Sequence, residues 1–145
     1  MTQKSNNKEK MFQITCNEDQ LHLICQALED WHRFVAGECE LNFATSFVEP
    51  TQDMHNVRKV LDQMVRPYIV PELDDKPGAS YGWDGYNCPN KHQRKAIAMS
   101  YGIYRQIRHF FALRKKDNGY SVYNSPTLHC DDQGPLIQIK EIENQ

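Results

Sequence analysis

An aromatic loop followed by a basic run is the feature of the sequence with the clearest chemical purpose. Residues 89–116 include eight Lys or Arg residues and no acid. Cations in such a block attract phosphate groups, and arginine binds them through two parallel hydrogen bonds. The stretch 71–89 leads into this run and contains Tyr81, Trp83 and Tyr86, whose rings can stack on a nucleobase. Together they predict a site for a small anionic nucleotide.

The basic run has the spacing of one long helix, from Lys91 to about Lys116, with Asn90 as its cap. Apolar side chains recur on one face, which is expected to pack in the core through Ile103, Ile107, Phe110 and Phe111. The opposite face, which includes Ala98, carries the cations and is expected to face the ligand. An ordinary solvated basic helix is the alternative. The predicted ligand-binding residues are Tyr81, Trp83, Tyr86, Lys91, Arg94, Tyr101, Arg105 and Arg108.

Motifs of catalytic and metal sites are missing from the sequence. It has no HExxH, GxSxG, Walker A or GxGxxG pattern. Cys88 and His92 have ligand-type side chains, as does the run 129–132, but no second pair has the spacing of a zinc site. We therefore expect no catalytic residue, no metal and no cofactor.

The elements that must position this site predict an α+β fold, mostly helical. Alternating apolar residues predict strands over 12–16, 120–123 and 136–142. A helix is expected over 18–36, with Asn17 as its cap and Gly37 as its stop, and a further one starts at Thr51 and is closed by Pro67 and Pro71. Three to four helices then pack on a small antiparallel sheet, which the N-terminal strand forms with the C-terminal strands. One domain is expected over 11–142, with a disordered tail at 1–10 and a short tail at 143–145.

Charge and cysteine content bear on partners and compartment. The net charge is −2, but residues 1–75 carry −6 and residues 76–145 carry +4. An acidic chain is a poor binder of duplex DNA. Five cysteines without a CxxC pair, no secretory signal and no long apolar run favour the cytoplasm of a bacterial host cell, without a membrane span.

Four segments carry a resemblance to a group of proteins: residues 12–34 (FQITCNEDQLHLICQALEDWHRF), the SYG at 80–82, the helix AMSYGIYRQIRHFFAL and the ending YNSPTLHCDDQGPLIQIKEI. Together they resemble the small accessory proteins of phages and prophages of gut bacteria. The resemblance covers residues 11–142. It implies a non-enzymatic anti-defence protein that sequesters a host immune nucleotide, often as a homo-oligomer with a pocket between subunits.

Two other functions stay open at this point. One is a protein-interaction module that inhibits a host defence protein through the acidic first half of the chain. The other is a small enzyme that processes nucleotides. Binding of a nucleotide would distinguish the predicted nucleotide-binding protein from an interaction module. Formation of a product would distinguish the enzyme from the nucleotide-binding protein.

Overall fold

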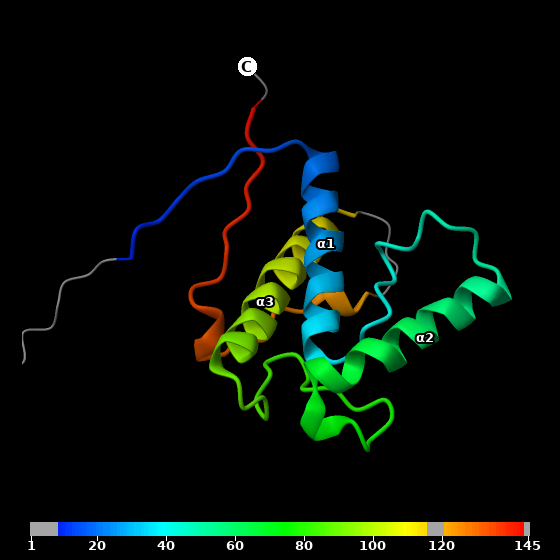
Figure 1. Cartoon of the computed structure of the whole chain (residues 1–145). Helices are drawn as coiled ribbons and strands as arrows, with labels where there is room; N and C mark the ends of the chain where they lie inside the picture. The colour runs from blue at the N-terminus through cyan, green and yellow to red at the C-terminus, as the bar shows by residue number, and fades with distance from the viewer. Residues whose placement is uncertain (1–8, 116–120, 144–145) are drawn as a thin grey trace, which may run out of the picture.

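Three α-helices dominate the computed structural model of the chain, which describes residues 9–115 and 121–143 (Figure 1). Tail residues 1–8 and 144–145 therefore lie outside the described part. The helices are α1 (Glu18–Ala36), α2 (Gln52–Ile69) and α3 (Lys91–Arg114), and the short 3₁₀ turns are η1 (Pro71–Leu73), η2 (Val122–Asn124) and η3 (Asp131–Gln133).

Helix α1 begins and ends at the residues that its sequence predicts. The Asn17 side chain accepts a hydrogen bond from the backbone N–H of Gln20 at 2.8 Å, and the Gln20 side chain accepts one from the Asn17 N–H at 2.9 Å. Gly37 ends the helix with a φ of 113°. A Cβ at that position would lie 2.9 Å from a methyl carbon of Val70, so glycine is required by space as well as by backbone conformation.

Helix α2 ends between the two prolines that are predicted to close it. Thr51 caps its start, Pro67 lies inside its last turn, and the helix ends at Ile69, two residues before Pro71. A proline this close to the end removes one backbone donor and leaves the final turn intact. The last turn is completed by the Val70 N–H, which donates to the Arg66 carbonyl at 2.9 Å.

The predicted antiparallel sheet is wrong, because residues 9–115 and 121–143 contain no β-strand. The chain is helical there and not α+β. Residues 9–17 are not helical and pair with no other segment, and Phe12 and Ile14 keep 86% and 83% of their surface exposed. Alternation marks a segment with one apolar side, but a strand also needs a neighbour that pairs with its backbone.

The C-terminal segment is likewise no strand. Ile137 and Ile139 are partly buried against the cluster formed by α1 and α3 and are not part of a ladder. The strand predicted at 120–123 is also wrong in its described part, where Val122–Asn124 forms η2. Its first residue, Tyr120, lies outside the described residues.

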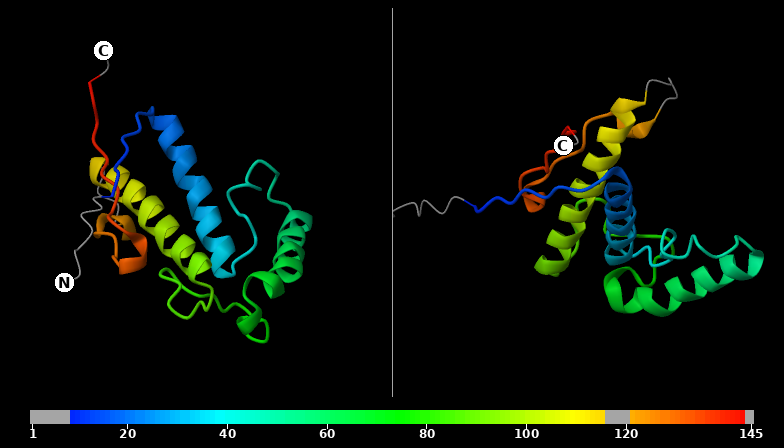
Figure 2. Two further views of the ribbon diagram at one scale, coloured as in Figure 1. Left: turned by 60° about the vertical axis from the view of Figure 1, so that its left-hand side comes forward. Right: turned by 90° about the horizontal axis from the view of Figure 1, so that it is seen from above.

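Helix α3 lies at the centre of the molecule, and α1 packs along it (Figures 1 and 2). Two clusters of buried side chains hold them together. The first lies between α1 and α3 and contains Cys25, Tyr101, Tyr104 and Ile107. The second joins the end of α1, the end of α2, the aromatic loop and the start of α3, and contains Ala36, Val70, Tyr81, Cys88 and Ile97.

The division of α3 into one core face and one exposed basic face is wrong. Ala98 and Tyr101 were assigned to the basic face by their spacing, yet they are 0% and 7% exposed. Phe110, assigned to the core face, is only half-buried. The reason is that α1, η2 and η3 all contact α3, so the helix is covered on several sides.

Helix α2 projects from the rest of the molecule (Figure 2). It contacts α1 at few positions, and Arg66 is its one buried residue. Within the described ranges, none of the helices combines the length and apolar character that crossing a membrane requires.

Candidate functional site

Three helix ends meet at Gln93, in the first turn of α3. Its amide nitrogen donates to the carbonyl oxygen of Val35 at 2.9 Å and to that of Ile69 at 2.8 Å. These carbonyls belong to the last turns of α1 and α2, where backbone acceptors have no partner within their own helix. One side chain therefore holds the ends of α1 and α2 beside the start of α3.

The loop between α2 and α3 is anchored to this junction. Arg66, only 6% exposed, donates to two backbone carbonyls of the loop. The backbone N–H of Tyr81 donates to the carbonyl of Ala36 at 2.9 Å. The anchored loop then places Trp83 against α3, where its ring centroid lies 5.1 Å from that of Tyr101.

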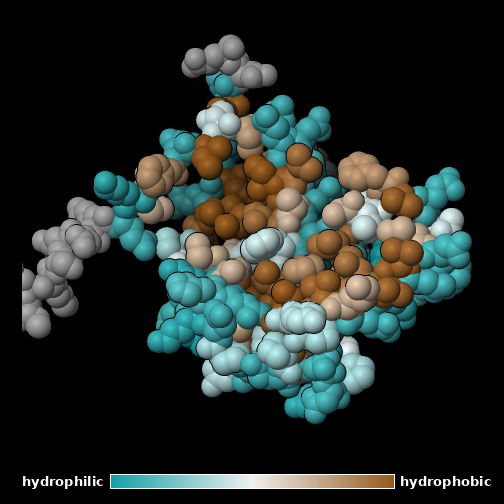
Figure 3. All heavy atoms as spheres, in the orientation of Figure 1, coloured by the Kyte–Doolittle hydropathy of each residue, from teal (hydrophilic) through white to brown (hydrophobic). Residues whose placement is uncertain are grey.

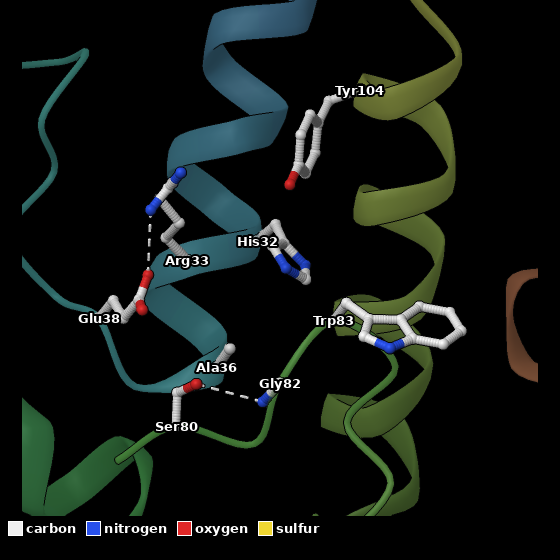
Figure 4. Close-up of a pocket in the computed structure, with 8 residues that line it drawn as sticks. All are labelled: His32, Arg33, Ala36, Glu38, Ser80, Gly82, Trp83 and Tyr104. Atoms are coloured by element: carbon white, nitrogen blue, oxygen red, sulfur yellow. Dashed lines mark hydrogen bonds and ion pairs between the residues drawn. The ribbon is translucent and has the colours of Figure 1, made fainter. Parts of the chain in front are cut away.

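A hollow of about 180 Å³ lies between the end of α1, this loop and the middle of α3 (Figure 4). Pockets for drug-sized ligands are commonly about 300–1,000 Å³, so a single chain offers room for one or two rings. The lining residues are His32, Arg33, Ala36, Glu38, Ser80, Gly82, Trp83 and Tyr104.

His32 presents a hydrogen-bond acceptor to the hollow. The side chain is buried, and its Nδ1 donates to the carbonyl oxygen of Ile97 at 2.8 Å. Burial lowers the pKa of His32 to about 4, and the nearby Arg33 charge acts in the same direction. The ring is therefore neutral at pH 7, with the proton on Nδ1. This leaves the lone pair of Nε2 free to accept, since no described residue donates to it.

Tyr104 presents a donor beside this acceptor. Its ring centroid lies 5.5 Å from that of His32, and its hydroxyl points from α3 toward α1 (Figure 4). Burial raises the pKa of Tyr104, so its hydroxyl keeps its proton. Within the described ranges no group of the protein pairs with that hydroxyl, and it is not among the buried polar atoms that lack a partner, so it is open to solvent. A neighbouring donor and acceptor thus face the hollow with neither group satisfied by the protein.

Arg33 supplies a positive charge at the rim of the hollow. Its Nη1 donates to Oε2 of Glu38 at 3.2 Å, and both side chains are about half exposed, at 44% and 50%. An ion pair with this much contact with water contributes little stability and can exchange partners. A ligand anion can therefore replace the Glu38 carboxylate on Arg33.

Three of the arginines predicted to bind a ligand have partners inside the protein. Arg94 Nε donates to Asp132 Oδ2 at 3.1 Å, and Arg108 Nη2 donates to Glu29 Oε2 at 3.0 Å. Arg105 donates to the carbonyl oxygen of a residue in η2 at 3.4 Å. These contacts fasten η3, α1 and η2 to α3, so the basic run serves the fold through acids distant in sequence.

Arg105 and Arg108 also share one aromatic ring. Their guanidinium carbons lie 4.6 Å and 5.1 Å from the ring centroid of Tyr123. The Nε atoms of both arginines are buried, and no partner accepts from them among the described residues. The Tyr123 ring gives these cations a favourable cation–π contact in place of a hydrogen bond at Nε.

The structure brings Trp83, Tyr101 and Arg105 together, with the guanidinium carbon of Arg105 5.8 Å from the Tyr101 ring centroid, and separates the remaining predicted site residues. Tyr81 and Tyr101 are buried in different clusters, while Tyr86 is 79% exposed and Lys91 is exposed. Of the eight predicted residues, Trp83 is the one that lines the hollow.

Sequence reasoning missed His32, Arg33 and Tyr104. In the sequence His32 follows the helical spacing of the apolar stripe of α1, and Tyr104 that of α3, so both read as core residues. Their burial agrees with that interpretation. Only the packing of α1 against α3 shows that their polar atoms face the same space, because residues 72 positions apart have no local pattern in common.

Metal binding finds no support in residues 9–115 and 121–143, where no three His, Cys, Asp or Glu side chains gather closely enough for an ion. No family model, curated protein or solved structure matches the chain.

Proposed function

We propose that the protein binds a small anionic nucleotide and holds its base in the hollow beside His32, Trp83 and Tyr104. The observation that carries this proposal is the free donor and acceptor on two buried rings, Tyr104 and His32. A nucleobase edge places a hydrogen-bond donor next to an acceptor, which complements such a pair. Both atoms are open to solvent in the hollow, since neither is among the buried polar atoms that lack a partner, so a ligand that accepts from Tyr104 and donates to His32 replaces water there and gains specificity.

Arg33 gives the site its preference for an anion. Its exposed guanidinium stands at the rim, where the phosphate of a bound nucleotide can replace Glu38. A charge-assisted hydrogen bond contributes about 1.5–3 kcal/mol. The arginines that were predicted from sequence but pair with groups of the protein itself, such as Arg94 with Asp132, are not required for this binding mode.

Binding without conversion is the mode that the side-chain chemistry favours. Burial raises the pKa of Cys25 and Cys39 to about 11, so these thiols are protonated at pH 7 and are weak nucleophiles. His32, with a pKa of about 4, is a weak general base at neutral pH. A protein that binds a nucleotide in this way could sequester it, in line with the resemblance drawn above.

Calorimetric titration of cyclic and linear nucleotides into the full chain tests the proposal. We expect Tyr104→Phe to weaken binding about two- to tenfold and Arg33→Ala about ten- to a hundredfold, from one lost neutral and one lost charge-assisted hydrogen bond. Tyr86→Ala and Lys91→Ala are the matched controls, because these residues were predicted from sequence but lie outside the hollow.

The controls distinguish two binding sites. Loss of binding in Tyr86→Ala and Lys91→Ala, with Tyr104→Phe unchanged, would place the ligand on the face predicted from sequence. Absence of binding by every nucleotide at millimolar concentration would exclude the proposal. Release of a product would favour the enzyme instead.

A further inference from the structure

Helix α2 carries an apolar stripe that no other part of the described chain covers. Val57, Val60, Met64 and Tyr68 follow each other at intervals of three or four residues and so lie on one side of the helix. They are 56%, 50%, 68% and 85% exposed. Burying such side chains is the usual reason for an amphipathic helix, so this stripe lacks its partner.

Helix α1 adds a second stripe on its side away from α3. Leu23, Ile24 and Trp31 are 64%, 41% and 54% exposed. In Figure 3 hydrophobic side chains gather over α1 and continue along α2 on the same side of the molecule. We call these seven residues the apolar face; its members are Leu23, Ile24, Trp31, Val57, Val60, Met64 and Tyr68.

Of the three helices, α2 has the fewest buried residues, and residues 9–17 are exposed throughout. Contiguous apolar surface of this kind marks an interface with another polypeptide.

The segment 9–16 is a second apolar surface without a partner, and we call it the arm. It leads away from the helices (Figure 2), and its Met11, Phe12 and Ile14 are 73%, 86% and 83% exposed. In extended backbone, alternate side chains lie about 6.6 Å apart. Positions four apart on a helix are separated by about 6 Å along the axis, so the arm can match the stripe of α2 residue by residue.

Charge favours the same pairing. Residues 1–10 contain three lysines and one acid, whereas residues 11–75 contain twelve acids and four basic residues. Asp53 lies one turn before Val57 on the same side of α2 and is exposed. In the arm, Lys10 comes just before the apolar residues and lies on the same side of the extended chain as Phe12 and Ile14. Opposite charges at matching ends of two apolar stripes fix their direction and speed their encounter.

We infer that the protein forms a dimer in which the arm of each copy docks on the apolar face of the other. Phe12 and Ile14 cover Val60 and Met64, which brings Lys10 beside Val57, one helical turn from Asp53 and within reach of its long side chain. The exchange is reciprocal, so one dimer contains two identical arm contacts. This inference is independent of the nucleotide site, because none of the seven residues of the apolar face lines the hollow.

The experiment measures molar mass against concentration by light scattering and sedimentation, on the full chain. We expect the wild type to have twice the chain mass of 17.0 kDa. The arm variant Phe12→Ser/Ile14→Ser and the face variant Val60→Ser/Met64→Ser are each expected to weaken association at least a hundredfold. Leu128→Ser is the matched control: Leu128 is 54% exposed but lies outside both surfaces, so dimerisation is unchanged.

Two further measurements test the pairing itself. An equimolar mixture of the arm and face variants retains one intact contact per pair, so we expect a mixed dimer weaker than wild type. The dissociation constant of wild type is expected to rise severalfold from about 0.05 M to about 0.5 M NaCl, as screening shortens the range of the charges. Far-ultraviolet circular dichroism checks that every variant is folded.

Two results would overturn the inference. The first is a wild type that stays at the chain mass up to about millimolar concentration, which would assign the apolar face to a different protein. The second is an arm variant that dimerises as tightly as wild type, which would exclude the arm as the occupant.

Discussion

Arg108 of α3 and Glu29 of α1 form an ion pair at 3.0 Å in which the Glu29 side chain is only 3% exposed. The arginine therefore offsets a carboxylate that is out of contact with water. Replacing Arg108 with Met leaves that charge buried and unpaired, so we expect a loss of about 3–5 kcal/mol in the free energy of unfolding, measured by urea denaturation. The double variant Glu29→Leu/Arg108→Met is expected to recover most of the loss.

This pair also separates the two views of the basic run. If Arg108 bound the ligand, its substitution would lower the affinity of the protein for the ligand and leave the free energy of unfolding unchanged. Unchanged stability in Arg108→Met would contradict the structural role that we assign to it.

Acid is expected to destabilise the protein through His32. Burial lowers its folded-state pKa from 6.5 to about 4, so between these pH values the unfolded chain binds a proton that the folded chain excludes. The free energy of unfolding therefore falls as the pH drops from about 6.5 to about 4, by about 3 kcal/mol from this residue. Below about pH 4 the His32 contribution is fully lost and changes no further.

Urea denaturation at several pH values checks this, with His32→Gln as the comparison. Glutamine does not titrate, so its curve is expected to be shallower across the same window. Parallel curves for the two proteins would show that His32 is not buried in its neutral form.

Two glycines of the aromatic loop form a matched pair for a test of packing. Both have positive φ, 64° at Gly85 and 81° at Gly82, but only at Gly85 would a Cβ meet neighbours, at 3.1 Å from Ile97 and 3.3 Å from Arg94. We expect Gly82→Ala to cost about 1 kcal/mol from backbone strain alone, and Gly85→Ala about 1–3 kcal/mol more. Thermal unfolding measures both, and equal losses would argue against the close packing of the loop on α3.

Thiol labelling tests the burial of the cysteines. Cys16 is exposed, whereas Cys25, Cys39 and Cys88 are buried and have a raised pKa. At pH 8 we expect the Cys16 thiol to react rapidly with an aromatic disulfide reagent. The partly buried Cys130 thiol, whose pKa is raised, is expected to react more slowly, and the three buried thiols only on unfolding. Rapid reaction of a second or third thiol in the region of α1 would mean that the contact between α1 and α3 is looser than described.

Local features of the fold were predictable from the sequence. The Asn17 and Gln20 capping box, the Gly37 stop and the Asn90 cap each depend on residues within one turn of the chain, and each is present. The sheet was not predictable, because pairing depends on which segments meet in space. Phe12 and Ile139 both lie in alternating patterns, yet Phe12 is exposed and Ile139 is partly buried against the cluster of α1 and α3.

In the candidate site, too, local features were predictable from the sequence and contacts between distant segments were not. The aromatic loop was identified by composition, and its Trp83 does reach the hollow. Charge density drew attention to Arg94 and Arg108, but their acidic partners, Asp132 and Glu29, are 38 and 79 positions away. The sequence shows that basic residues are concentrated in one segment, but only the fold shows that acidic residues from distant segments neutralise them.

The most direct test of the nucleotide proposal uses the fluorescence of Trp83. The chain has two tryptophans, and Trp31 is an exposed residue of α1 away from the hollow, so Trp31→Phe leaves Trp83 as the sole reporter. We expect a nucleotide to change the emission of this variant saturably, with the dissociation constant that calorimetry gives for wild type. Trp83→Phe, which keeps Trp31, is expected to show no saturable change. Emission from Trp83 that stays constant while calorimetry detects binding, or no response of either method at millimolar nucleotide, would contradict the proposed site.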